Sequence, residues 1–444
     1  MGQRRMEKTK VGLSDLEIFV PAPRMGLDTL VAHRIAEDPK FERRLKRAIE
    51  KTGQGAIRFP APYEDSATLA AQASYSLLRR NPDSTRRLRY IGTGTETTVD
   101  QSKPVAAYLE GMLQNSGVDV PETMMTFQTQ HACAGGTIAM MSIAGLLAGS
   151  SQDDSGLVVS SDIARYEAPS TAEITQGAGA VSLLVERDPK LVELDLDTQG
   201  LCSRDVDDFF RPIGSVTAKV KGAYSMQCYN EALEVAFEDH CKRRGTKPAD
   251  VLSSTDMFVF HVPFKLMALG AFRRLVNSYT GLDGDELTDF VNERGFEQSL
   301  EPNTRVGNLY TASTFMALAF LLKERYQTFG RDIVGKSILM ASYGSGNTMI
   351  ILSGRVAPGA PEVIETWDLD TVFRNERDAS FEEYETWLSA PHTAEKLHSL
   401  VNTAALPAEQ FYLASIREDG YREYAFSGVK AGEKNLEWAA TTTR

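Results

Sequence analysis

The chain has 444 residues, of which 42% are hydrophobic and 24% are charged, and its formal net charge is −12. These values are typical of a large globular protein with room for two or three domain-sized units. The acidic balance, without any basic block, argues against a nucleic-acid partner. No apolar run reaches membrane-spanning length, and the polar N-terminus lacks the apolar core of a signal peptide. We therefore expect a cytoplasmic protein that binds neither nucleic acid nor membrane.

The cysteine pattern also fits a cytoplasmic protein. The four cysteines are Cys133, Cys202, Cys228 and Cys241. They form no Cys-x-x-Cys pair and have no histidine partners at zinc-ligand spacing, so neither a metal site nor a disulfide framework is predicted.

The first predicted elements lead to a candidate base. Residues 11–20 read as a strand, and residues 27–37 and 41–51 as amphipathic helices. Asp65 is expected to cap a helix that ends near residue 78. A strand over residues 89–92 then leads to Glu96, which stands among glycines and threonines. A carboxylate at a strand end lies where α/β proteins place reactive groups, so Glu96 is a candidate general base, with an ordinary loop acid as the alternative.

Cys133 is the candidate nucleophile. It is followed by Ala134, by paired glycines at 135 and 136, and by an apolar run over residues 138–148 that predicts a buried helix. Free backbone N–H groups and the helix dipole at this position favour a thiolate. The glycines let a substrate carbonyl approach the backbone. The alternative is a buried structural cysteine.

Later strand ends carry further candidates. A strand over residues 156–160 is followed by Asp162, and two glycines precede a strand over residues 180–186. A helix is predicted over residues 224–240. A buried strand over residues 257–260 ends at His261, where an imidazole is well placed for chemistry, although a lone histidine is more often structural.

The chain then repeats the arrangement seen around Cys133. Asn308 precedes a small-residue helix predicted over residues 312–323, and strands over residues 338–342 and 348–352 flank a Gly-Ser-Gly bend at Ser345. Such a bend exposes backbone N–H groups and suits either an oxyanion donor or an ordinary hairpin. The repeated strand–loop–helix order predicts two similar halves, residues 1–190 and 191–355. Residues 356–444 are expected to form a helical extension packed on this core.

Ten segments spread along most of the chain carry a family resemblance. They read GTETTVDQSK, QHACAGGT, SDIARY, TQGAGAVSLLVE, DFFRP, YSMQCYNEALE, FHVPF, RVGNLYTAS, SYGSG and FYLASIREDGYREY, in this order. Together they resemble the 3-hydroxy-3-methylglutaryl-CoA (HMG-CoA) synthase family of the thiolase superfamily. The resemblance implies a thiolase-like α/β fold with five αβαβα layers, and a homodimer.

The resemblance also implies a reaction and its residues. Cys133 would be acetylated by acetyl-CoA, and Glu96 would take a proton from the acetyl methyl group. The resulting enolate would attack acetoacetyl-CoA, whose oxygens His261 and Asn308 would bind. Backbone N–H groups of Cys133 and Ser345 would form the oxyanion hole. In a dry pocket the pKa of Glu96 should be raised.

Contacts to the substrates are implied as well. Residues expected to bind the acyl group or CoA are Asp162, Thr175, Lys265, Tyr343 and Gly344. Because the CoA thioesters are themselves the substrates, no cofactor is expected.

Some positions depart from the family. Ala134 stands where an aromatic residue commonly follows the nucleophile, and residues 217–222 differ from the usual segment. These departures motivate two alternatives. One is a relative that condenses acetyl groups with carrier-protein-bound β-ketoacyl chains and so installs β-branches in polyketides. The other is a non-catalytic assembly partner.

Overall fold

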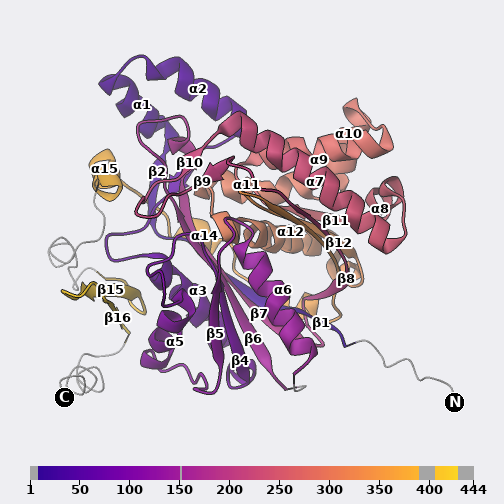
Figure 1. The fold of residues 1–444 in the computed structure, drawn as a ribbon, viewed down its shortest axis with the longest axis horizontal. Helices are drawn as coiled ribbons and strands as arrows, with labels where there is room; N and C mark the ends of the chain where they lie inside the picture. The colour runs from indigo at the N-terminus through magenta and orange to yellow at the C-terminus, as the bar shows by residue number, and fades with distance from the viewer. Residues whose placement is uncertain (1–8, 151–152, 390–405, 429–444) are drawn as a thin grey trace.

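The computed structural model describes residues 9–150, 153–389 and 406–428 (Figure 1). Most strands belong to one nine-stranded sheet. In sheet order these strands are β11 (Met257–Phe260), β12 (Ser337–Gly344), β13 (Thr348–Val356), β8 (Val192–Ser203), β1 (Val11–Phe19), β7 (Gly177–Arg187), β6 (Ser155–Ala164), β4 (Leu88–Gly94) and β5 (Met125–Thr129). The expected α/β class is confirmed.

This sheet consists of two similar groups of strands. In the first, β1 pairs with β7 and β7 with β6 in antiparallel fashion, and β6 pairs with β4 in parallel. In the second, β8, β13, β12 and β11 repeat this order and these directions. The groups meet only where β1 and β8 share two residue pairs, Gly12 with Glu193 and Leu13 with Val192. The prediction of a thiolase-like fold with two similar halves is therefore confirmed, and β5 is an edge strand that has no counterpart in the second group.

The helices follow the same repeat. The first group is accompanied by α3 (Ser66–Arg80), α5 (Val105–Asn115) and α6 (Gly135–Ala148), and the second by α7 (Gly222–Arg244), α9 (Lys265–Thr280) and α12 (Ser313–Phe329) (Figure 1). Successive residues of a strand face opposite sides of its sheet. Leu157 and Val159 of β6 accordingly pack in one cluster with α3 and α5, whereas Val158 packs in another with α6 and α12. The apolar helices that follow Cys133 and Asn308 thus form the inner layer.

Shorter elements complete the described chain. They are β2 (Pro23–Gly26), α1 (Leu27–Glu37), α2 (Phe41–Thr52), β3 (Ala56–Arg58), α4 (Pro82–Thr85), η1 (Glu173–Thr175), β9 (Phe209–Phe210), β10 (Lys219–Val220), α8 (Pro248–Ser254), α10 (Gly284–Glu293), α11 (Phe296–Val306), η2 (Tyr310–Ala312), η3 (Gly330–Ile333), α13 (Ala360–Glu365), α14 (Thr371–Arg374), β14 (Arg377–Asp378), α15 (Phe381–Ser389), β15 (Phe411–Ile416) and β16 (Arg422–Phe426). Within the described ranges, no helix is both long and apolar enough to span a bilayer.

The elements predicted from hydrophobic periodicity all form. The seven predicted strands correspond to β1, β4, β6, β7, β11, β12 and β13, and the six predicted helices to α1, α2, α3, α6, α7 and α12. Asp65 caps α3 as expected, since its carboxylate accepts hydrogen bonds from the backbone N–H groups of Ala67 and Thr68 at 3.0 and 3.1 Å.

The extension after residue 355 is not purely helical, which corrects the prediction for residues 356–444. It contributes α13, α14 and α15, but also the hairpin β15–β16. Asp419-Gly420 provides the hairpin turn, with Gly420 in the left-handed region at φ 87°. Phe411 and Phe426 of the hairpin pack against Tyr75 of α3. Part of this segment, residues 390–405 and 429–444, lies outside the described residues.

Candidate active site

The four predicted catalytic residues occupy equivalent places in the two halves. Glu96 lies two residues after β4, and His261 directly follows β11, which is the equivalent strand. Cys133 lies two residues before α6, and Asn308 precedes η2 and α12, which is the equivalent helix. Because the two halves face each other across α6 and α12, the repeat brings one reactive group from each of these positions toward a common centre.

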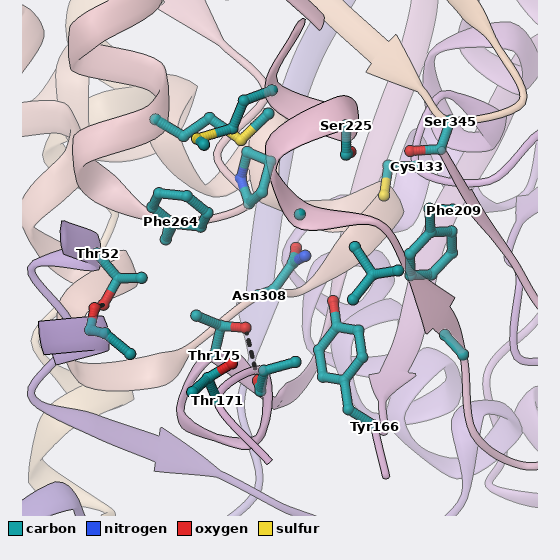
Figure 2. Close-up of a pocket in the computed structure, with 18 of the residues that line it drawn as sticks. Thr52, Cys133, Tyr166, Thr171, Thr175, Phe209, Ser225, Phe264, Asn308 and Ser345 are labelled. Carbon is teal, nitrogen blue, oxygen red and sulfur yellow. Dashed lines mark hydrogen bonds between the residues drawn. The ribbon is translucent and has the colours of Figure 1, made fainter. Parts of the chain in front are cut away.

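That centre opens onto a cavity of about 840 Å³. Around the thiol it is lined by Cys133, Tyr166, Thr175, Phe209, His261, Asn308, Tyr310, Tyr343 and Ser345. Its far side is lined by Thr52 and Lys51 of α2 and by Phe264 and Met267 near the start of α9. Figure 2 shows Cys133 beside Ser345 and Phe209, with Thr52 on the opposite side of the cavity. A long ligand can therefore reach the thiol from the surface near α2.

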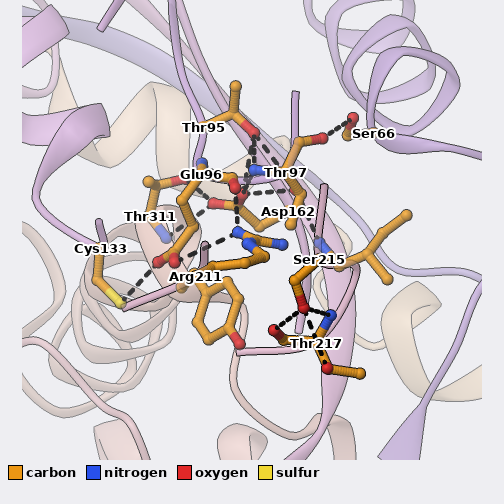
Figure 3. A network of polar contacts seen from close by, with 12 residues as sticks. Ser66, Thr95, Glu96, Thr97, Cys133, Asp162, Arg211, Ser215, Thr217 and Thr311 are labelled. Carbon is orange, nitrogen blue, oxygen red and sulfur yellow. Dashed lines mark hydrogen bonds and ion pairs between the residues drawn. The ribbon is translucent and has the colours of Figure 1, made fainter. Parts of the chain in front are cut away.

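Glu96 contacts the thiol directly. The thiol of Cys133 donates a hydrogen bond to Oε1 of Glu96, with Sγ and Oε1 3.3 Å apart (Figure 3). The pKa of Glu96 is raised to about 8, mainly because burial disfavours the charged form. The charge of Asp162 contributes to the rise, and Arg211 and the hydrogen bond from Cys133 oppose it. The predicted rise in pKa is confirmed. A carboxyl group with this pKa can both accept and return a proton near neutrality.

The prediction of a resting thiolate at Cys133 is wrong. Burial raises the pKa of its thiol well above the usual value, and the negative charge of Glu96 adds to the effect, as do Asp162 and Asp208. The expectation relied on the start of α6 as a positive helix end. Three neighbouring carboxyl groups in a closed pocket outweigh that partial charge, so the thiol holds its proton until the acceptor beside it takes it.

His261 and Asn308 present neutral hydrogen-bonding groups to the cavity. Burial lowers the pKa of His261 to about 3, and its Nδ1 atom has no partner within the described structure. Asn308 accepts hydrogen bonds at its side-chain oxygen from the Tyr310 N–H at 2.9 Å and the Ser313 hydroxyl at 3.1 Å. Its NH₂ group is therefore the part that can donate to a ligand (Figure 2).

Asp162 does not contact this cavity, which corrects its predicted role in substrate binding. It is fully buried, and its carboxylate accepts from Thr95, from Thr97, from the Glu96 N–H at 2.9 Å and from the Thr311 hydroxyl at 2.5 Å (Figure 3). Its contacts join the loop that carries Glu96 to the segment after Asn308. Asp162 therefore fixes the distance between groups of the two halves.

The bend after β12 lies against the loop of the nucleophile. A Cβ atom at Gly344 would come within 2.3 Å of the His131 carbonyl oxygen, so only glycine fits this approach. Gly344 thus sets the packing rather than binding substrate, which corrects its predicted role, whereas Tyr343 and Ser345 do line the cavity. Buried Asp208 holds the bend, because it accepts from the Gly346 N–H at 2.9 Å and the Tyr343 hydroxyl at 2.8 Å.

Comparison with known proteins decides the family. A family model described as hydroxymethylglutaryl-coenzyme A synthase N terminal matches residues 7–190, and the corresponding C-terminal model matches residues 192–292 and 286–427. The chain belongs to the hydroxymethylglutaryl-CoA synthase family. The hydroxymethylglutaryl-CoA synthase of Haloferax volcanii is 31% identical over 416 residues, which cover 85% of this chain and 91% of that protein.

Two solved structures illustrate the likeness. MvaS in complex with 3-hydroxy-3-methylglutaryl coenzyme A is 32% identical with a TM-score of 0.82, and the match covers 95% of this chain and all of that one. The curacin biosynthetic pathway HMG synthase in complex with holo donor-ACP has a TM-score of 0.79 over 94% of this chain and all of that one. At 23% identity, this second likeness shows a shared fold alone.

The CoA contacts predicted for this member of the hydroxymethylglutaryl-CoA synthase family are only partly met. Thr175 lines the cavity. Lys265 does not, because its ammonium group is paired with Glu301 and, at 3.1 Å, with Glu297. The contact of Lys265 with CoA therefore stays a prediction. Lys51, which sequence reasoning did not single out, lines the cavity instead and has no ion pair with any described residue.

Arg211 is a second residue that sequence reasoning missed. It lies just after β9, donates a hydrogen bond to the backbone oxygen of Glu96, and its Nη2 is 3.5 Å from the Glu96 carboxylate (Figure 3). The side chain of Arg211 is only 15% exposed and that of Glu96 only 6%. The DFFRP segment that contains Arg211 was part of the synthase-family resemblance, but nothing in the sequence placed it against the base 115 positions away.

Proposed function

We propose that this protein is a hydroxymethylglutaryl-CoA synthase, an acyltransferase that condenses acetyl-CoA, acetoacetyl-CoA and water into HMG-CoA and free CoA. The observation that carries the proposal is the hydrogen bond from Cys133, which lines the cavity together with His261 and Asn308, to Glu96 beside it. A nucleophile, a base and two neutral donors around one space are the groups that this carbon–carbon condensation needs.

The first half-reaction would acetylate Cys133. Glu96 takes the thiol proton, the sulfur attacks the thioester carbonyl of acetyl-CoA, and the proton leaves with the CoA thiol. The negative oxygen of the tetrahedral intermediate would be stabilised by the backbone N–H groups of Cys133 and Ser345, which the packing of Gly344 against the nucleophile loop keeps together.

The second half-reaction would form the new carbon–carbon bond. Glu96 removes a proton from the methyl group of the acetyl-cysteine, and the enolate attacks the ketone carbon of acetoacetyl-CoA. The neutral His261 and the NH₂ group of Asn308 donate to the acetoacetyl oxygens. Glu96 then returns its proton to the tertiary alkoxide. The raised pKa makes Glu96 a stronger base than an ordinary carboxylate, but the methyl group is a far weaker acid, so the enolate also needs the oxyanion donors.

Water would complete the cycle by hydrolysing the thioester to Cys133, which releases HMG-CoA with a free carboxylate. One acetyl-CoA, one acetoacetyl-CoA and one water account for every product atom, and the proposal assigns no step to a cofactor or metal.

The test is direct. Purified protein mixed with acetyl-CoA and acetoacetyl-CoA should form HMG-CoA and release one CoA per product, as followed by chromatography and thiol titration. Cys133→Ala should gain no acetyl group by intact-protein mass spectrometry and form no product. Acetylation and turnover that persist in Cys133→Ala would refute the role of Cys133. An inactive native protein would refute the proposed activity and favour the non-catalytic alternative.

The carrier-protein alternative has weaker support. The solved enzyme bound to a donor-ACP is 23% identical, whereas relatives named for CoA substrates reach 31–32%. We therefore propose free CoA thioesters as the substrates. A competition assay that offers acetoacetyl-CoA against a carrier-bound β-ketoacyl chain distinguishes the two, since a preference for the carrier would favour the alternative.

We further propose that the protein works as a cytoplasmic homodimer. All four cysteines are free, which suits a reducing compartment. The edge strand β5 is half-exposed and offers unpaired backbone groups to a second copy. Light scattering of the purified protein, and mass measurement of a Met125→Lys variant on this edge, test the dimer.

A further inference from the structure

The segment of residues 173–177 supports two residues of the cavity. Its Thr175 carbonyl oxygen accepts the backbone N–H of Asn308 at 3.1 Å, and its Gln176 side-chain oxygen accepts the backbone N–H of Tyr166 at 2.8 Å. Gly307, at φ 92°, lies so close that a Cβ atom there would be 1.8 Å from the Gln176 carbonyl oxygen. The positions of Asn308 and Tyr166 (Figure 2) therefore depend on where this segment lies.

Tyr384 holds the segment from outside the two halves. It lies on α15 and is fully buried. Its hydroxyl donates to Oε1 of Glu173 at 2.9 Å and accepts from Nε2 of Gln176 at 2.7 Å. A single oxygen of the C-terminal extension thus satisfies buried groups at both ends of the segment, and it orients the Gln176 amide so that its oxygen faces Tyr166.

Glu173, at the start of the segment, is held firmly by an arginine. Glu173 is fully buried and receives hydrogen bonds from Arg34, with Nη2 2.6 Å and Nε 3.2 Å from its carboxylate. Arg34 also binds Glu385 of α15 at 2.5 Å. Because Glu173 is fixed by this paired arginine, loss of the Tyr384 hydroxyl would be felt mainly at Gln176, and through it at Tyr166.

Glu96 and Cys133 are held by other contacts. The loop of Glu96 is anchored by Asp162, and Cys133 by its place before α6. The hydrogen bonds of residues 173–177 therefore reach the backbone of Asn308 and Tyr166 and include neither Glu96 nor Cys133, although the ring of Tyr166 packs in one cluster with Cys133. In the reaction proposed above, the face of the cavity that carries Asn308 is the one that binds the acetoacetyl group.

We propose that Tyr384 is a positioning residue for the condensation step, through which the C-terminal helix α15 sets the site of the second substrate. The proposal rests on the function proposed above. It predicts a separation that a purely structural tyrosine would not produce: acetylation of Cys133 proceeds normally, while use of acetoacetyl-CoA is impaired.

Tyr384→Phe tests this, because it keeps the ring, which packs against Phe59 and Trp387, and removes only the hydroxyl. We expect the rate of Cys133 acetylation by acetyl-CoA alone to stay within about twofold of the native rate. Condensation should fall roughly tenfold in kcat/KM for acetoacetyl-CoA, the change expected when a buried hydrogen-bonded network loses one member. Tyr75→Phe is the control, since it removes a tyrosine hydroxyl with two hydrogen-bond partners that lies outside the cavity lining, although its partners are more exposed than those of Tyr384.

Gln176→Met gives a second route if Tyr384→Phe unfolds. It breaks the same link from the other end and should show the same separation of the two steps. The double variant should be no worse than Gln176→Met alone, because both changes interrupt one path. Equal losses in acetylation and condensation, or unchanged use of acetoacetyl-CoA in both variants, would overturn the proposal. Failure of the native protein to acetylate would instead refute the proposed function.

Discussion

Removing the charge of Arg211 should shift the pH dependence of condensation toward higher pH. The Nη2 atom of Arg211 lies 3.5 Å from the Glu96 carboxylate, and both side chains are largely buried. At an effective dielectric constant of about 20, such a pair interacts by roughly 5 kcal/mol. Since about 1.4 kcal/mol corresponds to one pKa unit, this is an upper bound of roughly 3.5 units, and water that enters the vacated space reduces it. We therefore expect Arg211→Met to raise the pKa of Glu96 by about 1–3 units.

The consequence follows from the protonation state that the base needs. With a pKa of about 8, only roughly a tenth of Glu96 is ionised at neutral pH. A rise of about 1–3 units reduces that fraction by roughly 10–1,000-fold, and condensation at neutral pH should fall by the same factor. Because the carboxylate is the active form, the rate should recover as the pH increases.

The assay is single-turnover condensation of pre-acetylated enzyme with acetoacetyl-CoA across the neutral and alkaline range. Arg211→Lys keeps the charge and should shift the rising limb of the profile less than Arg211→Met. Arg204→Met removes an arginine whose pair with Glu231 is about half exposed, and should leave the profile unchanged. A profile for Arg211→Met that does not move, or that moves to lower pH, would show that Arg211 does not control the ionisation of Glu96.

Three further predictions concern the base, the imidazole and a buried ion pair. Glu96→Gln should reduce condensation about 10²–10⁴-fold and acetylation less, as measured by rapid quench and mass spectrometry; equal losses would contradict its role as the base for carbon–carbon bond formation. His261→Ala should lower kcat for condensation by roughly 10²–10³-fold. Because burial lowers its pKa to about 3, no ionisation of His261 should appear in the native profile near neutrality. Arg34→Met should reduce the free energy of unfolding by about 3–5 kcal/mol, since it leaves the buried Glu173 carboxylate without its partner. Arg331→Met, at an exposed pair, should leave it almost unchanged in the same urea titration.

The predictable part of the fold is the part governed by local periodicity. The helices that follow Cys133 and Asn308 and the strand that ends before His261 were predicted, because buried strands and inner helices have unbroken apolar sequences. The hairpin β15–β16 was missed although Asp419-Gly420 is a turn signal, since the surrounding acidic and aromatic residues resembled a helical surface segment. The edge strand β5 was missed because it is half-exposed and short.

The active site shows a second limit of prediction from sequence. Candidate residues could be named one at a time from strand ends and helix starts, but contacts between distant segments could not. Arg211 reaches Glu96 across 115 positions, and Tyr384 reaches Gln176 across 208. The error about Cys133 has the same origin, because its pKa depends on burial by the folded chain and on carboxyl groups of three separate segments.

The proton that the thiol of Cys133 holds in the resting site has a consequence for the order of events. With the thiol of Cys133 and the carboxyl group of Glu96 both raised in pKa, the pocket without substrate avoids a buried thiolate next to a buried carboxylate, which would repel each other at 3.3 Å. The sulfur then becomes negatively charged only when an acyl carbonyl lies at the backbone N–H groups. The charge passes to the carbonyl oxygen as the sulfur attacks. After acetylation the sulfur has no proton to lose, so Glu96 is free to act on the methyl group instead. One carboxyl group can thus serve two successive substrates because the first reaction removes its first partner.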